Sequence, residues 1–298
     1  MRRRTLLTAL LLVPTGLLVA AGPAWALPAV TPASPDPAPT LAPDVEVLRL
    51  RGLLQREVTV TVPRTPASDA AWIELARAEI TAASFALDRP QLLVVVDRNP
   101  RVQQLVLLMA APPSNLNGGD WKVIGGTKVS TGSMGRFDHY VTPRGIFRMT
   151  DAILGFRAEG TLNENGIRGL GSKGMRVWDF GWHVAQKGWK EAPGKPDSTP
   201  IRLMMHATDP DKLEQRIGRP ASQGCIRIPS AMNRFLDNHG VLDADYERAA
   251  ITDIRFRTLL PPGRTPSLLA GTAMVVVDSA ATSRSTVASA TPAPTRTP

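Results

Sequence analysis

The chain has 298 residues, with 35 lysines and arginines against 26 aspartates and glutamates and a formal net charge of +9 at pH 7. The basic excess is spread along the chain, which favours anionic envelope surroundings and excludes the concentrated basic stripe of a nucleic-acid-binding protein. Its single cysteine excludes an internal disulfide. The fold must therefore be stabilised by a hydrophobic core, and the chain is long enough to form one.

Residues 1–26 predict a cleaved secretory signal peptide. Arg2–Arg4 are positive, residues 6–21 are apolar, and Ala24–Ala26 offer small residues at the spacing of a cleavage site. The apolar stretch is short and interrupted by a proline and a glycine, so it is a poor membrane span. We expect export to the periplasm or cell envelope and no stable membrane span after cleavage. An uncleaved anchor is the alternative, and both the general and the twin-arginine export routes stay open.

Composition divides the rest of the chain into four parts. Residues 27–44 are rich in proline and alanine and predict an extended linker, and residues 279–298 predict a disordered tail. Residues 45–87 predict a small N-terminal strand and helix segment. Residues 88–278 predict the main folded domain.

Two elements are predicted in the N-terminal segment. The alternating residues 57–63 (EVTVTVP) are typical of a strand with its valines on one face. A helix begins near Pro66 and carries an apolar stripe at helical spacing, which indicates core packing. The stripe consists of Trp72, Ala76, Ile80, Ala83 and Leu87.

The main domain is predicted to be mainly β. Residues 91–97 and 103–110 are buried strands around a turn-rich segment and predict a hairpin. One short helix is predicted over 230–240, with Ser230 as its N-cap and Gly240 as its stop. Many short strands with few helices indicate a β-sandwich or barrel-like domain. The further strand candidates are 121–132, 145–151, 176–184, 201–207 and 273–278.

A glycine motif and three of the four histidines predict no chemistry. Gly169–Gly174 matches G-x-G-x-x-G, but no hydrophobic strand precedes it and no helix follows, so residues 155–174 are interpreted as a surface loop flanking a site. The histidines form no metal motif, and we expect no structural zinc. His239 fits the end of a helix, His183 a packed position, and His139 a turn or a cleft lining.

The fourth histidine, His206, and the cysteine, Cys225, form a candidate catalytic pair. His206 follows an apolar run and precedes a polar loop, so it ends a strand where a scaffold can direct it into a cleft. A thiol reacts as its thiolate, and a neighbouring imidazole can accept the proton and stabilise the anion. An exposed thiol without a role is unfavourable in an oxidising compartment. The alternative is a buried cysteine that acts as a small hydrophobe.

The residues around Cys225 suit such a site. Gly224 permits close backbone approach, and backbone amides near it could bind a developing oxyanion. Ser222 offers a hydroxyl, and Arg227 a planar cation for a carboxylate.

These motifs resemble the L,D-transpeptidase catalytic domain family (YkuD-type). The resemblance is carried by His206, a fifteen-residue spacer and S-Q-G-C-I-R at Ser222–Arg227, together with V-S-T-G at 129–132 and T-P-R-G-I-F at 142–147. It covers roughly residues 90–278. It implies a β-sandwich of mixed sheets with a few short helices.

The resemblance also implies a reaction. Cys225 would attack the bond between diaminopimelate and the terminal D-alanine of a peptidoglycan stem peptide, form a thioester and release D-alanine. His206 would act as the base, and backbone amides at Gly224 and Cys225 would hold the oxyanion. Arg227 would bind a substrate carboxylate or brace the site, and Ser222 and Gln223 would lie beside the substrate. The resemblance implies no metal or organic cofactor, and it implies that carbapenems would acylate Cys225.

The alternatives differ in the acceptor of the acyl group and in whether the protein is catalytic at all. An amine acceptor gives transpeptidation, water gives an L,D-carboxypeptidase, and a lysine of an envelope lipoprotein gives an anchoring enzyme. A non-catalytic wall-binding module is a further alternative. Two departures from the family pattern bear on these: Ala207 stands where members often have glycine, and Gln223 where they often have histidine or arginine.

Overall fold

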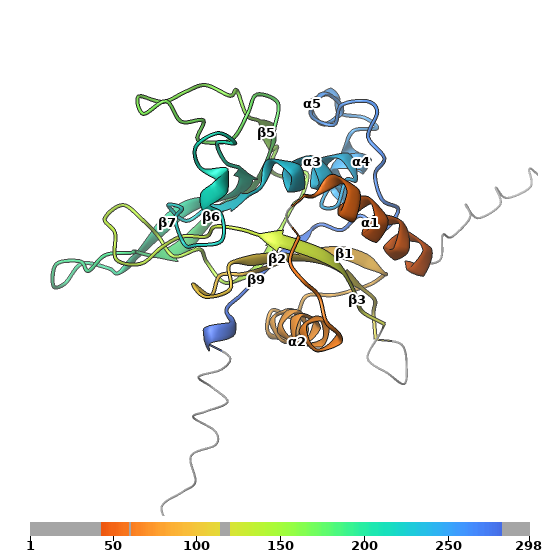
Figure 1. Cartoon of the computed structure of the whole chain (residues 1–298), viewed down its shortest axis with the longest axis horizontal. Helices are drawn as coiled ribbons and strands as arrows, with labels where there is room; N and C mark the ends of the chain where they lie inside the picture. Colours follow the sequence, from red (N-terminus) through yellow and green to blue (C-terminus); the bar gives the residue numbers. More distant parts are fainter. Residues whose placement is uncertain (1–42, 60, 114–119, 282–298) are drawn as a thin grey trace, which may run out of the picture. The chain divides into compact units, whose positions relative to one another are not determined.

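The structure is a computed structural model that describes residues 43–59, 61–113 and 120–281. The predicted signal peptide, nearly all of the predicted linker and most of the predicted tail lie outside these residues. The described residues form two mixed β-sheets with a few helices (Figure 1). The predicted mainly-β class, a sandwich of mixed sheets, is confirmed.

The first sheet has five strands in the order β3-β2-β1-β9-β4. β1 (Gln91–Asp97) and β2 (Gln104–Ala110) pair antiparallel as the predicted hairpin. β9 (Ala273–Val277) pairs parallel with β1, so the sheet joins both ends of the main domain. β3 (Lys122–Lys128) and β4 (Gly145–Arg148) are the edge strands. Alternate residues of β1 face opposite sides, and all are buried because both faces of the sheet are covered.

The second sheet has four strands in the order β5-β6-β7-β8. β6 (Arg176–Gln186) and β7 (Ser198–Ala207) form a long antiparallel pair that runs side by side in Figure 1. β8 (Ile226–Ile228) pairs parallel with the end of β7, and β5 (Phe156–Arg157) is a short edge strand. Leucines, methionines and aromatic residues from both sheets form one core cluster. The pairing of β7 with β8 places the end of β7 beside the segment that carries Cys225.

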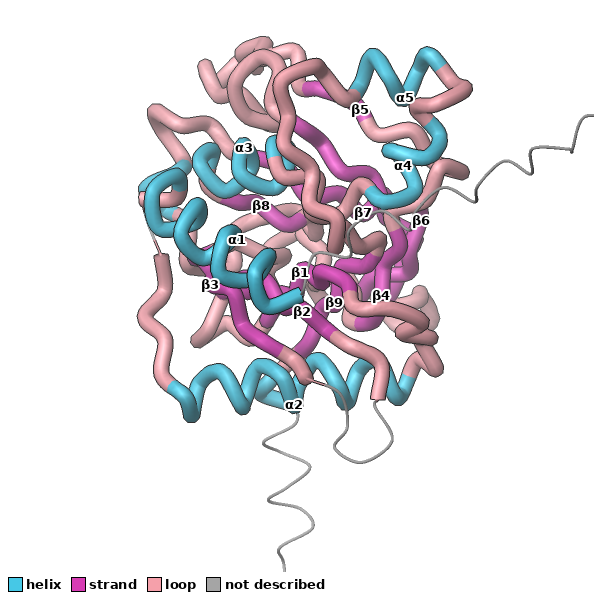
Figure 2. Tube along the Cα trace, turned by 90° about the vertical axis from the view of Figure 1, so that its right-hand side faces the viewer, coloured by secondary structure: helices cyan, strands magenta, loops and turns pink. Residues whose placement is uncertain are grey.

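Two N-terminal helices cover opposite sides of the first sheet (Figure 2). α1 (Pro43–Glu57) begins within the predicted linker and packs into the core shared by the two sheets. α2 (Pro66–Ala82), the predicted helix, is capped by Thr65 and covers the outer face of the first sheet with Ala76 and Ile80. No helix in the described residues is long and apolar enough to span a bilayer.

The strand predicted over 57–63 is wrong. The N–H of Val58 donates to Leu54 O at 3.0 Å, which continues the hydrogen bonding of α1. Residues 58, 59 and 61–65 belong to no helix or strand, and the N–H of Val62 donates to Gly126 O of β3 at 3.1 Å. Val58 and Val62 are both buried. The alternating pattern therefore marks a connector that packs against the core without forming a ladder.

The helix predicted near residue 230 is present as α3 (Ser230–Asn238), but its cap differs. Pro229 holds the N-cap position and provides no side-chain cap. The Ser230 hydroxyl instead donates to Glu214 Oε2 at 2.6 Å. Three short helices were not predicted: η1 (Glu214–Arg216), α4 (Ala244–Ala249) and α5 (Ile254–Leu259).

Candidate active site

The parallel pairing of β7 with β8 brings the predicted site residues to one place. The register aligns Met205 with Ile226 and His206 with Arg227. Met205 and Ile226 are fully buried in the core between the sheets. Because successive side chains of a strand point to opposite faces, His206 and Arg227 share the other face of the second sheet.

Cys225 lies directly before β8, against the backbone of β7. Its Sγ is 3.8 Å from the carbonyl oxygen of Arg202. Burial raises the pKa of the Cys225 thiol, while a hydrogen bond from the Met204 backbone and the charge of Arg227 act in the opposite direction. Burial has the largest effect, so the resting side chain is a protonated thiol that needs a base.

The geometry of His206 fixes which ring nitrogen can act as that base. Its Nδ1 is 2.6 Å from the carbonyl oxygen of Ala207. A carbonyl only accepts, so Nδ1 carries the proton and Nε2 keeps its lone pair. Burial lowers the pKa of His206 to about 4, and the nearby Arg227 charge adds to this shift. At neutral pH the imidazole is therefore an uncharged base, and an ion pair with Cys225 forms only when the proton moves.

The depressed pKa of His206 predicts a pH-dependent stability. The ordinary value is 6.5 and the folded value about 4, so the unfolded chain binds this proton first. The contribution of the neutral His206 to stability is fully present above pH 6.5. As the pH falls towards 4, this contribution is lost and the free energy of unfolding decreases by about 3 kcal/mol. Denaturant unfolding at pH 7 and pH 4 should show that the His206→Gln variant loses about 3 kcal/mol less than the wild type. An identical loss in both proteins would contradict the assignment.

One buried threonine holds the cysteine loop in place. Thr142 Oγ1 donates to the carbonyl oxygen of Gly224 at 2.8 Å and accepts the N–H of Gly132 at 2.9 Å. A Cβ at Gly132 would lie 1.8 Å from the carbonyl oxygen of Tyr140, so only glycine fits there. The V-S-T-G and T-P-R-G-I-F motifs therefore meet the cysteine motif through the hydroxyl of Thr142.

Replacing this threonine should loosen the loop. Thr142→Val keeps the shape of the side chain but leaves the Gly132 N–H and the Gly224 carbonyl unpaired. We expect a loss of about 2–3 kcal/mol in the free energy of unfolding. Thr142→Ser retains the hydroxyl and should lose less than half as much. A larger loss in Thr142→Ser than in Thr142→Val, measured by denaturant unfolding, would show that the methyl group and not the hydroxyl holds the loop.

The remaining residues of the cysteine motif bond within the loop or to its neighbour. Buried Ser222 donates from its Oγ to the carbonyl oxygen of Cys225 at 2.5 Å and accepts the N–H of Gly224 at 3.1 Å. The Gly224 amide, expected as an oxyanion donor, is thus engaged in the resting site. Gly224 has φ +118°, a conformation that favours glycine. Exposed Gln223 donates to Asp138 Oδ2 at 3.1 Å.

Arg227 supplies a positive charge beside the pair. Its Nη1 is 3.4 Å from the carbonyl oxygen of Ala221, and its buried Nε has no hydrogen-bond partner among the described residues. The charge of Arg227 lowers the pKa of both His206 and Cys225. The guanidinium therefore favours thiolate formation and keeps an unused donor in the site.

His139 is a supporting residue whose role the sequence did not reveal. It is buried, and its Nδ1 is 2.8 Å from Ser222 O and 2.9 Å from Ser133 Oγ, so it braces the cysteine loop. His183 is packed as predicted, with its Nε2 2.9 Å from Phe180 O. His239 is the C-cap of α3 as expected, and it also bridges to α1 through Glu57 Oε2 at 3.1 Å.

The loop predicted over 155–174 contains the short strand β5 near its start, and the rest of it is attached to the segment that follows His206. The N–H of Arg168 donates to Asp209 Oδ2, and its Nη1 donates to Asp211 Oδ2, both at 2.8 Å. Ala207 lies within β7 and is not among the residues with positive φ. The backbone there does not require glycine, so this departure from the family pattern leaves the histidine in place.

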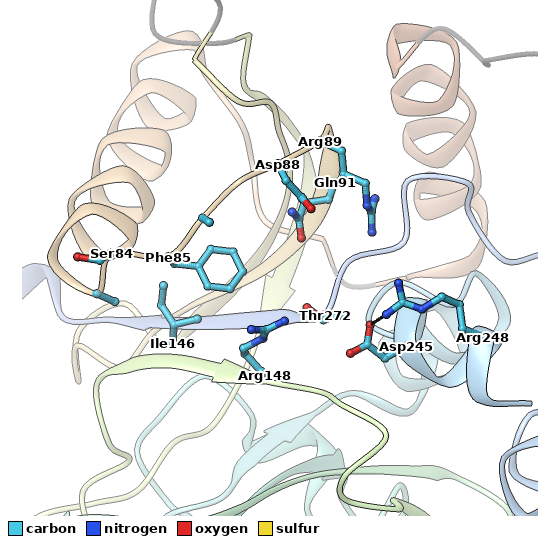
Figure 3. A pocket seen from close by; sticks show the side chains of 12 residues that line it. Ser84, Phe85, Asp88, Arg89, Gln91, Ile146, Arg148, Asp245, Arg248 and Thr272 are labelled. Atoms are coloured by element: carbon cyan, nitrogen blue, oxygen red, sulfur yellow. Dashed lines mark hydrogen bonds and ion pairs between the residues drawn. The ribbon is translucent and has the colours of Figure 1, made fainter. Parts of the chain in front are cut away.

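A separate cavity of about 620 Å³ opens between the segment after α2, β4 and α4 (Figure 3). Arginine side chains enter it, and Asp245 pairs with Arg248 at 2.5 Å. Its lining holds neither a thiol nor an imidazole, so it does not contain the chemistry predicted from the sequence. Within the described part of the chain, no group of three or more His, Cys, Asp or Glu side chains could hold a metal ion.

Comparisons with known proteins place this site in a family. No curated protein gives a significant match. A solved structure of a fused Zn-dependent amidase/peptidase/peptidoglycan-binding domain-containing protein from Clostridium acetobutylicum is 12% identical over 74% of this chain and 65% of that chain, with a TM-score of 0.26, a likeness too low to carry an argument. Residues 114–256, which include His206 and Cys225, match the family model of the L,D-transpeptidase catalytic domain. The chain thus carries an L,D-transpeptidase catalytic domain of the YkuD family.

Proposed function

We propose that this protein is an exported peptidoglycan L,D-transpeptidase with Cys225 as nucleophile and His206 as base. The observation that carries the proposal is the hydrogen bond from His206 Nδ1 to the Ala207 carbonyl. It leaves the basic Nε2 free on the face of the sheet that His206 shares with Arg227, at the point where the Cys225 loop enters β8. The catalytic-domain family supports a peptidoglycan substrate.

In the first half-reaction, His206 Nε2 takes the proton from Cys225 Sγ. The thiolate attacks the carbonyl carbon between diaminopimelate and D-alanine, and the negative charge moves to the carbonyl oxygen. The tetrahedral intermediate collapses to a thioester as the C–N bond breaks. The imidazolium returns its proton to the departing amine of D-alanine. Arg227 favours the thiolate at the start of this sequence.

In the second half-reaction, an amine acceptor attacks the thioester and His206 takes a proton from the attacking nitrogen. A new amide bond forms, and Cys225 leaves as a thiolate that regains its proton from His206. Transfer to water would give an L,D-carboxypeptidase, and transfer to a lipoprotein lysine would give an anchoring enzyme. The proposed location is the periplasm or cell envelope, reached through the N-terminal signal.

The test is product analysis with purified protein. A diaminopimelate-containing disaccharide-tetrapeptide, alone and with an amine acceptor, is incubated with the protein and the products are identified by mass spectrometry. We expect free D-alanine and a cross-linked dimer. Tripeptide without dimer would reassign the protein as a carboxypeptidase. No release of D-alanine from any donor would overturn the proposal in favour of a non-catalytic wall-binding module.

A further inference from the structure

Trp182 is an exposed tryptophan on the same sheet as the candidate nucleophile. Its side chain is 66% exposed, whereas Trp178, four residues earlier on β6, is fully buried in the core. Residues four apart on a regular strand share a face. The register between β6 and β7 shifts between Asp179 and Trp182, and this bulge turns Trp182 to the outer face.

The exposed indole is held beside a fixed cation. Trp182 pairs with Arg202 across the two strands, and the Arg202 guanidinium carbon is 6.0 Å from the centroid of the indole ring. Arg202 Nε donates to Asp179 Oδ2 at 2.7 Å, and that carboxylate is buried. The aromatic face and the guanidinium therefore form a preorganised, solvent-facing pair. Such a pair offers an apolar stacking surface next to hydrogen-bond donors.

The strand geometry sets the distance from this pair to Cys225. The carbonyl of Arg202 already touches the Cys225 sulfur. By the register, Trp182 lies opposite Arg202, and Cys225 lies beside Met204, two residues further along β7. Two strand spacings of about 4.8 Å and two rises of about 3.3 Å therefore separate the Cα atoms of Trp182 and Cys225 by about 12 Å. Three extended peptide residues span about 10 Å. In the proposed reaction the acyl carbon belongs to the third stem residue, so the sugar that carries the stem would lie about this far from the sulfur.

We propose that Trp182 and Arg202 bind the sugar at the start of the donor stem. This inference rests on the proposed function and deepens it by assigning the polymer end of the substrate. The C–H face of a pyranose ring stacks on the indole, and the N–H groups of Arg202 that do not face Asp179 donate to sugar hydroxyl or acetamido oxygens. The free stem peptide lacks the sugar, so Trp182 and Arg202 contribute only to the recognition of stems that are linked to glycan.

The test compares two donors, the free tetrapeptide and the same stem linked to its disaccharide. Trp182→Ala should lower kcat/KM for D-alanine release about 5- to 10-fold with the disaccharide donor and less than twofold with the free peptide, as expected for loss of one aromatic contact. Trp182→Phe should recover most of the loss. Ile251→Ala, which removes another exposed apolar side chain, should change neither donor. Equal losses with both donors, or no loss, would overturn the inference.

A binding measurement separates this inference from the proposed reaction. In the Cys225→Ala background, calorimetry with the disaccharide-tripeptide should give a Kd about 5- to 10-fold weaker when Trp182→Ala is added, while the Kd of the free tripeptide stays unchanged. This result would support the sugar site even if the wild type released no D-alanine. An unchanged Kd for the disaccharide-tripeptide would reject the site even if D-alanine release were observed.

Discussion

Replacing Cys225 by alanine should abolish D-alanine release, with kcat/KM falling about 10⁴-fold or more. In the proposed reaction the sulfur forms the covalent bond of the intermediate, and no second thiol exists in the chain to replace it. Cys225→Ser should be nearly as inactive. A hydroxyl is far less acidic than a thiol, and a neutral imidazole with a pKa of about 4 is a weak base for it.

Mass spectrometry of the intact protein provides the covalent readout for this prediction. After incubation with a carbapenem, the wild type should gain one adduct on Cys225 and the alanine variant none. Unchanged thermal unfolding of Cys225→Ala would show that the loss is chemical and not structural. An adduct that persists in Cys225→Ala, or retained D-alanine release, would remove this residue from the mechanism.

The proposed nucleophile, Cys225, and the proposed base, His206, could be predicted from the sequence because both depend on residue type. One cysteine and one strand-ending histidine sit in motifs that are specific to the family, and the strands on either side carry strong apolar patterns. The contacts that hold Cys225 in place could not be predicted. Thr142 donates a hydrogen bond to Gly224, which is 82 residues away in the sequence, and the residues next to Thr142 in the sequence do not indicate that partner. His139 lies in a polar stretch that is equally typical of a turn.

The spacing of apolar residues also does not predict which side chains are buried where the backbone departs from regular strand geometry. Trp178 and Trp182 have the spacing of one strand face, and only the bulge between them puts one in the core and the other in solvent. α1 was missed for a related reason. Val47, Leu50 and Leu54 recur at helical spacing, but the proline-rich run before them and the alternating valines after them favour extended chain.

The second large effect is expected at His206. His206→Gln keeps a polar side chain of similar length, but it has no basic nitrogen to take the proton of Cys225. We expect kcat/KM for D-alanine release at pH 7 to fall about 10²- to 10⁴-fold, the range for loss of a general base. The free energy of unfolding at pH 7 should change little by comparison.

The pH profile distinguishes a base from a structural residue at this position. In the wild type the uncharged imidazole is required, so kcat/KM should be lost as the pH falls through about 4 and stay flat through neutral pH. In His206→Gln the thiolate must form without a base, and burial raises the pKa of Cys225. The residual rate should therefore rise with pH across the neutral and alkaline range, and the gap to the wild type should narrow. A variant that is equally impaired at every pH would indicate that His206 positions the loop and that another group accepts the proton.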